Sequence, residues 1–346
     1  MKISGIGASF PVTSCSNEDA VTKLEKNSMD KFNFRLGEKS ENLLDKLNAT
    51  GIRNRYWLSG KESHIDLVSD AVDKALAEAS MSKDEIDLII YSSVFRQFIE
   101  PGESFFIAKA LGFKNVECFD VLEACNSFVR ASNISQAYLN AGQYDNILVI
   151  TAEFSPHKKE FEPCFEMKDY SNLSYLFSIL TAGEGASATI FSRGEQEWEQ
   201  EMIAMPQHAN FCYLPIAGMS QYELELYELN EPDVSNYRFV SYSLKLHKEG
   251  HNVLKNMILK HIREKGMGDI VLPHSHSLNV WDKFNKELGG TIPYFHIFPD
   301  YGNLVTGSFP VAIHLAKKEN KLKRTMKVGA WMAAAGMSLS ITSFEF

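Results

Sequence analysis

A cysteine near the middle of the chain lies in a setting typical of a nucleophile. Cys125 stands in the stretch 119–128, where an apolar run leads in and small residues follow. Apolar residues at helical spacing predict a helix that runs to about Leu139 and begins near Cys125. The unpaired N–H groups and the dipole at a helix N-terminus favour a thiolate. The alternative interpretation is a core cysteine, because free cysteine is among the most buried residue types.

Two histidines and an asparagine follow in the second half of the chain. The run 269–276 predicts a strand that ends in His274 and His276, whose spacing of two puts both rings on one face. Asn303 stands in Tyr-Gly-Asn, shortly before a predicted helix over about 308–317. The alternatives are a hydrogen-bonded strand-end histidine and a turn or N-cap asparagine. No cluster of Cys, His or Asp supports a His-x-His metal site, so no metal is expected.

A weak internal repeat predicts that these residues meet. Helix 64–79, strand 87–92 and the Cys125 helix resemble helix 251–263, strand 269–274 and the helix near Ser308. The strand-to-helix spacing is the same in both halves: Asp87 precedes Cys125 by 38 residues, and Asp269 precedes Gly307 by 38. Two similar halves, 1–193 and 194–346, would place Cys125 opposite Asn303 near a pseudo-twofold axis.

Other segments are predicted from their periodicity and from their turn residues. Residues 27–50 are polar and show no clear period. The remaining predicted elements are helices over 101–111 and 280–288, buried strands over 146–151 and 291–298, and paired strands over 327–346.

Composition limits the classes of function. The chain has 346 residues, of which 45% are hydrophobic and 23% charged, and a formal net charge of −9. This charge argues against nucleic acid or an anionic membrane as the main partner. No apolar run reaches the ~18 residues of a membrane span, and the N-terminus lacks the apolar stretch of a signal peptide. Five cysteines without a CxxC pair indicate a reducing cytoplasm as the location.

Six motifs in this order resemble the thiolase-fold condensing enzymes, specifically β-ketoacyl-acyl-carrier-protein synthase III and its relatives. They are Gly51-Ile-Arg-Asn-Arg, the stretch Asp120–Phe128, Gly183-Glu-Gly-Ala-Ser-Ala, Pro273-His-Ser-His, Tyr301-Gly-Asn and Ala334-Ala-Gly-Met-Ser. The resemblance covers nearly the whole chain. It implies an α/β fold, the five-layered α-β-α-β-α thiolase arrangement built from two pseudo-repeated halves, and a homodimer.

The resemblance implies a catalytic triad of Cys125, His274 and Asn303. Cys125 would take an acyl group from a coenzyme A or carrier-protein thioester. A decarboxylative Claisen condensation with a malonyl- or β-ketoacyl-type carrier thioester would follow. His274 and Asn303 would stabilise its enolate, with the backbone N–H groups of Cys125 and Ala335 as a second oxyanion hole. Two alternatives stay open: acyl transfer to an alcohol or amine with His274 as base, and an inactive partner subunit of a heterodimeric synthase.

Expectations about substrates and partners follow from the same resemblance. Coenzyme A and phosphopantetheine thioesters are expected as substrates, with no cofactor. The substrate pocket is expected to include Phe128 and also Glu100, which stands where relatives commonly contribute an apolar residue to the partner subunit's pocket. An acidic acyl carrier protein is expected to dock on the helix near 251–262 through Lys255, Lys260 and Arg263, unless these side chains are only a solvated helix face.

The chain also departs from the family pattern. His274-Ser-His-Ser replaces the common His-Gln-Ala-Asn, and Ala335 stands where relatives commonly have glycine. The tryptophan segment that often packs on the adenine of coenzyme A has no clear match within residues 27–50. These departures predict an acyl group that is longer, unsaturated or aromatic rather than acetyl.

Overall fold

The computed structural model describes residues 1–28, 37–229 and 238–346. Its strands are β1 (Lys2–Ser9), β2 (Ser14–Ser16), β3 (Asn54–Tyr56), β4 (Leu88–Tyr91), β5 (Glu117–Asp120), β6 (Asn146–Glu153), β7 (Gly185–Ser192), β8 (Glu199–Ala204), β9 (Cys212–Tyr213), β10 (Val240–Ser241), β11 (Ile270–Pro273), β12 (Lys327–Ala334) and β13 (Ser338–Glu345). Its α-helices are α1 (Asn17–Ser28), α2 (Gly37–Ala49), α3 (His64–Ala79), α4 (Glu103–Ala110), α5 (Ser127–Asn140), α6 (Leu173–Leu176), α7 (Gln221–Leu226), α8 (Ser243–Lys265), α9 (Leu278–Glu287), α10 (Phe298–Tyr301) and α11 (Ser308–Lys318).

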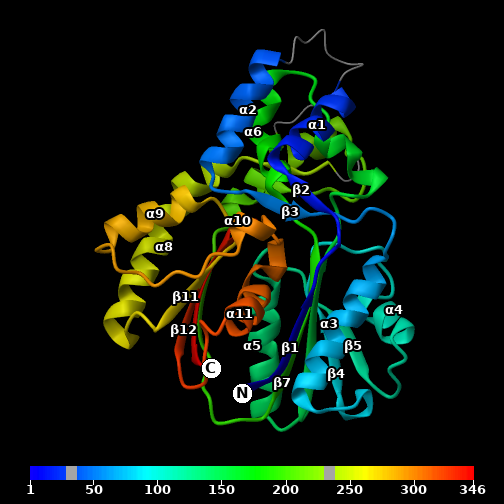
Figure 1. Cartoon of the computed structure of the whole chain (residues 1–346), viewed down its shortest axis with the longest axis vertical. Helices are drawn as coiled ribbons and strands as arrows, with labels where there is room; N and C mark the ends of the chain where they lie inside the picture. The colour runs from blue at the N-terminus through cyan, green and yellow to red at the C-terminus, as the bar shows by residue number, and fades with distance from the viewer. Residues whose placement is uncertain (29–36, 230–237) are drawn as a thin grey trace.

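Two mixed sheets form the frame of the molecule. The first has the order β1-β7-β6-β4-β5, with β4 parallel to both of its neighbours, and the second has the order β11-β12-β13-β8. Helices α5 and α11 lie between the sheets, α3 and α4 cover the outer face of the first, and α8 and α9 cover the outer face of the second (Figure 1). This is the expected five-layer arrangement.

The apolar patterns explain the layers. β4 is buried along its whole length and β6 along all but its first residue, since both faces of the first sheet are covered by helices. Helix α3 begins with a capping box between Ser63 and Asp66 and buries one apolar stripe against β1 and β7. Gly5 lets this helix approach closely, because a Cβ there would collide with the backbone oxygen of Ala75.

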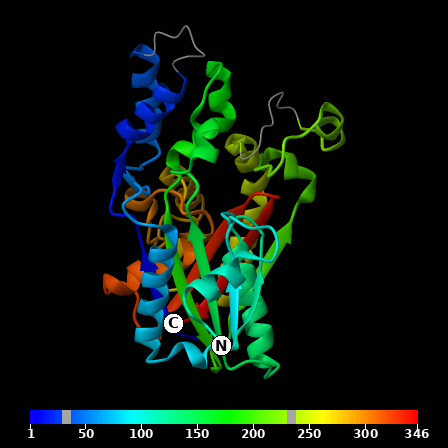
Figure 2. The same ribbon diagram turned by 90° about the vertical axis from the view of Figure 1, so that its right-hand side faces the viewer.

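A cap of helices lies beyond one end of the sheets. It contains α1, α2 and α6, and Figure 2 shows it extending past the strands. The sequence did not place α2, since Leu43 and Leu47, both buried, give only a narrow stripe in a polar segment.

The predicted strand over 291–298 is wrong. The structure shows only a single bridge between Tyr294 and Val271 of β11. Pro293 lies within this segment and has no N–H to donate to a strand ladder, although its carbonyl accepts from Val271 at 2.9 Å.

The other predicted elements are present with shifted ends. The helix expected over 251–262 starts earlier, at Ser243. The paired C-terminal strands are β12 and β13, joined by a tight turn that contains Ala335. The chain leaves the first sheet after Ser192 and enters the second at Glu199. The division into two repeated halves, 1–193 and 194–346, stays a prediction. Among the described residues, no helix combines the length and apolar character needed to cross a membrane.

Candidate active site

Cys125 lies just before α5, on the wall of a cavity of about 780 Å³. The preceding Ala124 has φ of 45°, in the left-handed region that non-glycine residues seldom adopt. Asn126 holds the start of the helix against β13: its Nδ2 donates to Ser338 Oγ at 2.8 Å, and its Oδ1 accepts from Ser340 at 2.7 Å. The start of α5 next to Cys125 is therefore fixed to the second sheet, although Cys125 precedes that sheet in the chain.

Burial dominates the pKa of the Cys125 thiol. It raises this pKa well above its usual value, while the backbone N–H groups of Cys125 and Ala335 lower it by a smaller amount. Desolvation therefore opposes the effect of the helix terminus. Cys125 and Ala335, whose N–H groups are the predicted oxyanion donors, both line the cavity.

His274 follows the last residue of β11, is only 5% exposed, and lines the same cavity. Burial lowers its pKa to about 4, so the ring is neutral at pH 7. Its Nδ1 lies 3.1 Å from the Ser308 hydroxyl, which in turn donates to the Val305 carbonyl at 2.9 Å. The His274 carbonyl accepts from Trp281 Nε1 at 3.0 Å, so backbone and ring are both held.

Asn303 is held by its own loop. Its Oδ1 accepts from the Val305 N–H at 2.8 Å, which leaves the amide nitrogen on the other side of the group as a donor. Its backbone is clamped to the segment 181–183: Asn303 N donates to Thr181 O, and Gly183 N donates to Asn303 O at 2.9 Å. Only glycine fits at position 183, where a Cβ would meet the Tyr301 carbonyl.

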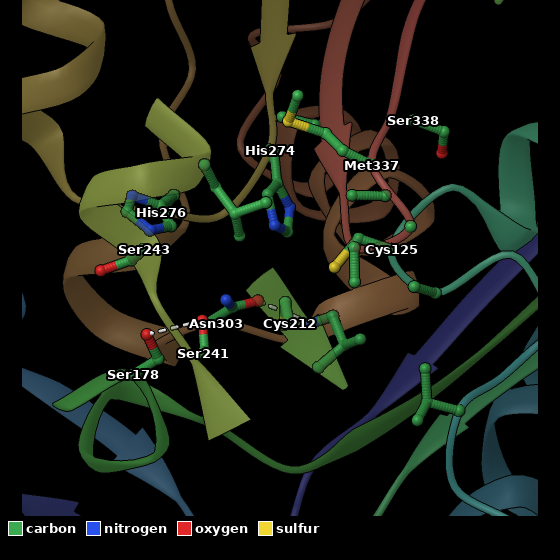
Figure 3. A pocket seen from close by; sticks show the side chains of 18 of the residues that line it. Cys125, Ser178, Cys212, Ser241, Ser243, His274, His276, Asn303, Met337 and Ser338 are labelled. Carbon is green, nitrogen blue, oxygen red and sulfur yellow. Dashed lines mark hydrogen bonds between the residues drawn. The ribbon is translucent and has the colours of Figure 1, made fainter. Parts of the chain in front are cut away.

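Figure 3 shows the three predicted triad residues around one end of the cavity, with His276 beyond His274. They come from the end of β5 and start of α5, the end of β11, and the loop before α11. The Gly51-Ile-Arg motif supports this loop, because Arg53 pairs with Asp300 at 2.7 Å and its N–H donates to Pro299 O at 2.7 Å. The structure thus explains why the motifs occur together.

Sequence reasoning missed Glu153, a buried carboxyl group that lines the cavity at the end of β6. It accepts from Val94 N at 2.9 Å, Phe95 N at 3.1 Å and Thr306 Oγ1 at 2.7 Å, and so joins the two halves of the chain. Burial raises its pKa to about 7 despite these donors. An acidic residue at the carboxyl end of a buried apolar run was the available signal.

The two predicted pocket residues do not line this cavity. Phe128 is fully buried between the sheets, where its ring packs edge-on against Phe309 at 5.5 Å, so its assignment to the pocket is wrong. Helical periodicity turns it into the core rather than towards the cavity. Glu100 is exposed in the single chain and also lies outside the cavity lining, and a role in a partner subunit's pocket stays a prediction.

The three predicted docking side chains lie on α8, and two of them have acidic partners. Lys255 pairs with Glu287 at 2.9 Å, and Lys260 pairs with Glu201 at 3.2 Å. Exposed pairs of this kind contribute little, so the cations stay accessible to a competing acidic surface. Among the described residues, no group of His, Cys, Asp or Glu side chains has a geometry that can hold a metal ion.

Comparisons with known proteins agree with this geometry. The family model described as 3-oxoacyl-[acyl-carrier-protein] synthase III matches residues 119–209, the segment that contains Cys125. The β-ketoacyl-[acyl-carrier-protein] synthase III of Aquifex aeolicus is 26% identical over 287 residues, which cover 80% of this chain and 81% of that protein.

Solved structures match over the whole length. OleA of Xanthomonas campestris, in a structure with lauric acid and lauroyl-CoA, superposes with a TM-score of 0.81 at 20% identity, covering 99% of this chain and 98% of that one. The Aquifex aeolicus synthase III structure gives 0.76 at 22% identity, with 100% and 99% covered. The thiolase fold predicted from the motifs is confirmed.

Proposed function

We propose that this synthase III-like condensing enzyme of the thiolase fold works through an acyl group carried on Cys125. The acyl group comes from a coenzyme A or carrier-protein thioester and is then joined to a second thioester by Claisen condensation. The observation that supports this proposal is the convergence of Cys125, His274 and Asn303, from three distant segments, on one cavity. The Cys125 sulfur attacks the donor thioester and breaks its carbon–sulfur bond, and the proton of the Cys125 thiol passes to the departing sulfur, so the donor leaves as a thiol.

The condensation step needs donors for the enolate oxygen of the second substrate. The Asn303 amide nitrogen and the Nε2–H of neutral His274 would supply them, and the N–H groups of Cys125 and Ala335 would bind the oxygen of the acyl-Cys carbonyl as it is attacked. A malonyl-type extender loses CO₂ to give the carbanion. A β-ketoacyl-type extender would instead give up an α-proton to a base, a role that the Glu153 carboxylate on the cavity wall is placed to take, and both classes of extender fit the proposal.

The acyl group is proposed to be longer than acetyl. The cavity volume is well within the range of about 300–1,000 Å³ that drug-sized ligands occupy. Much of its lining is apolar, including Phe161, Leu214, Phe239, Leu246 and Leu254. The structural relative OleA binds lauroyl-CoA, which supports a fatty acyl donor for this chain as well.

Intact-protein mass spectrometry tests the loading step. We expect lauroyl-CoA and octanoyl-CoA to acylate the protein faster than acetyl-CoA, with the adduct on Cys125. Cys125→Ala should carry no adduct, whereas Cys118→Ala, a cysteine of β5 outside the cavity lining, should load normally. Equal or faster loading from acetyl-CoA would overturn the chain-length proposal, and no adduct from any donor would leave only the inactive partner subunit.

A second experiment separates condensation from plain acyl transfer. Addition of a malonyl thioester to the loaded enzyme should release CO₂ and give a β-ketoacyl product. Asn303→Ala should still load but should condense about 100- to 1,000-fold more slowly, the usual effect of removing one oxyanion donor. If Asn303→Ala condenses normally, the proposed role of this amide is wrong.

One observation favours acyl transfer as the second candidate. If the Ser308 hydroxyl donates its proton to the Val305 carbonyl, its oxygen can only accept from His274, so Nδ1 must carry the ring proton. The other ring nitrogen, Nε2, then has a free lone pair and can act as a general base. Acylation of an added alcohol or amine without CO₂ release would identify this activity.

A further inference from the structure

The wall of the cavity carries three histidines that the proposed chemistry does not use. One of them, His251, pairs with Glu287 at 3.0 Å, and the other two are His276 and His247. His276 lies two residues beyond His274 at the end of β11, and His247 lies on α8; both line the cavity. The rings of His247 and His276 meet edge to face with centres 4.7 Å apart. The rings of His276 and His274 have centres 6.3 Å apart, so the histidine pair adjoins the proposed catalytic group.

The His276 ring has an unused polar atom. Its Nδ1 is buried and has no hydrogen-bond partner among the residues that the structure describes. A buried polar atom in this state is uncommon in native structures. The other ring nitrogen, Nε2, also has no partner among the described residues, but it is not closed off in this way, and the ring borders the cavity. Nε2 is therefore the atom to which a molecule in the cavity can bond.

The charges around the cavity define the kind of partner. Burial lowers the pKa of His247 to about 4 and that of His276 well below its usual value, so both rings are neutral at pH 7. The arginine of the cavity lining, Arg130, is paired with Glu123 at 2.6 Å, and Glu153 adds a second acidic group. The described lining therefore offers hydrogen bonds but no spare cation, which favours an uncharged oxygen over a carboxylate.

We propose that His276, supported by His247, binds the 3-oxo oxygen of a 3-oxoacyl thioester whose thioester carbonyl is bound at His274. A 1,3-dicarbonyl compound carries two neutral oxygens a few bonds apart and can engage two neighbouring imidazole rings at once. The proposal rests on the proposed function for the position of the thioester. It narrows the extender from the malonyl and β-ketoacyl classes to the β-ketoacyl class.

Two ligands that share the same pantetheine arm test whether His276 binds the 3-oxo oxygen. Octanoyl-pantetheine and 3-oxooctanoyl-pantetheine differ only in the keto group, and Cys125→Ala prevents acylation during calorimetry at pH 7. We expect the keto compound to bind about tenfold more tightly, as one good hydrogen bond to a buried partner allows. When Cys125→Ala is combined with His276→Phe, the ratio of the two affinities should fall to about one. When it is combined with His276→Asn instead, the keto compound should keep part of its advantage.

The control is His261→Phe in the same background, a histidine of α8 that does not line the cavity and should leave the ratio unchanged. Equal affinity of the two ligands before any change at His276, a ratio that survives His276→Phe, or tighter binding of malonyl-pantetheine than of the keto compound would each overturn the proposal. Acyl loading of Cys125 is measured separately in the protein without substitutions. The result therefore distinguishes a wrong role for His276 from a wrong proposed function.

Discussion

At the scale of single residues, Ser308 connects the ring of His274 to the first turn of α11. Its hydroxyl has one proton and two acceptors within reach, His274 Nδ1 and Val305 O, and the Val305 carbonyl also accepts from the Ser308 backbone N–H. Ser308 is therefore a positioning residue that selects the tautomer of His274. If the Ser308 hydroxyl donates to Nδ1 of His274, the ring proton is on Nε2, which can then donate to a substrate oxygen.

We expect Ser308→Ala to lower kcat about tenfold with little change in KM, since one hydrogen bond of about 1–1.5 kcal/mol is lost from the group that stabilises the enolate. Ser308→Thr keeps the hydroxyl and should restore most of the rate. Nitrogen NMR of His274 should show a change in tautomer for the alanine variant only. Ser135→Ala, a buried serine of α5 that bonds within its own helix, is the control. Unchanged kcat and tautomer in Ser308→Ala would contradict the positioning role.

At the scale of elements, α8 contributes to two surfaces with different tasks. Its inner face carries His247, Gly250 and Leu254 to the cavity, and its outer face carries the three predicted docking cations. The acidic partners of Lys255 and Lys260 reduce the local positive charge, while Arg263 lies one turn further towards the C-terminus. The docking surface stays a prediction that a charge reversal can test.

Lys260→Glu combined with Arg263→Glu should raise KM for a carrier-bound substrate about tenfold, because the acidic carrier would meet like charges near Glu201. KM for the matching coenzyme A thioester should stay the same. Lys318→Glu combined with Lys321→Glu, two exposed positions at and just after the end of α11, is the control with the same change in net charge. An equal rise in KM for both substrates would contradict docking on α8.

At the scale of the whole molecule, buried neutral histidines predict sensitivity to acid. The pKa values of His247 and His274 are lowered from 6.5 to about 4, and that of His276 is lowered as well, in each case mainly by burial. Between pH 6.5 and about 4 the unfolded chain binds these protons and the folded protein does not, so the free energy of unfolding should fall as the pH falls.

Glu153 has the opposite effect on how the free energy of unfolding depends on pH. Its pKa is raised from 4.5 to about 7, so between these values the folded protein holds a proton that the unfolded chain has lost, and acid stabilises it. Burial also raises the pKa of Glu103 and lowers that of four further histidines, which are His64, His261, His296 and His314. The histidines outnumber the two carboxyl groups, so the net effect should be loss of stability below pH 6.5. Urea unfolding at pH 7.5, 6.0 and 5.0 measures this, and a free energy of unfolding that is constant or rises towards pH 5.0 would contradict the assignment of the histidines as buried and neutral.

The sequence by itself determined the order of the motifs, most helices and strands, and the types of the triad residues. These depend on local periodicity and on residue chemistry, which short segments carry whatever surrounds them. The predicted strand over 291–298 failed where a proline removed a ladder donor.

The tertiary structure alone decided which groups share the cavity. It turned Phe128 into the core, brought Glu153 and His247 to the cavity wall, and placed the ring of His276 on that wall without a hydrogen-bond partner among the described residues. It also raised the pKa of the Cys125 thiol by burial, against the expectation from its place near a helix start. Burial and side-chain contacts arise between segments up to 308 residues apart, so no local pattern predicts them.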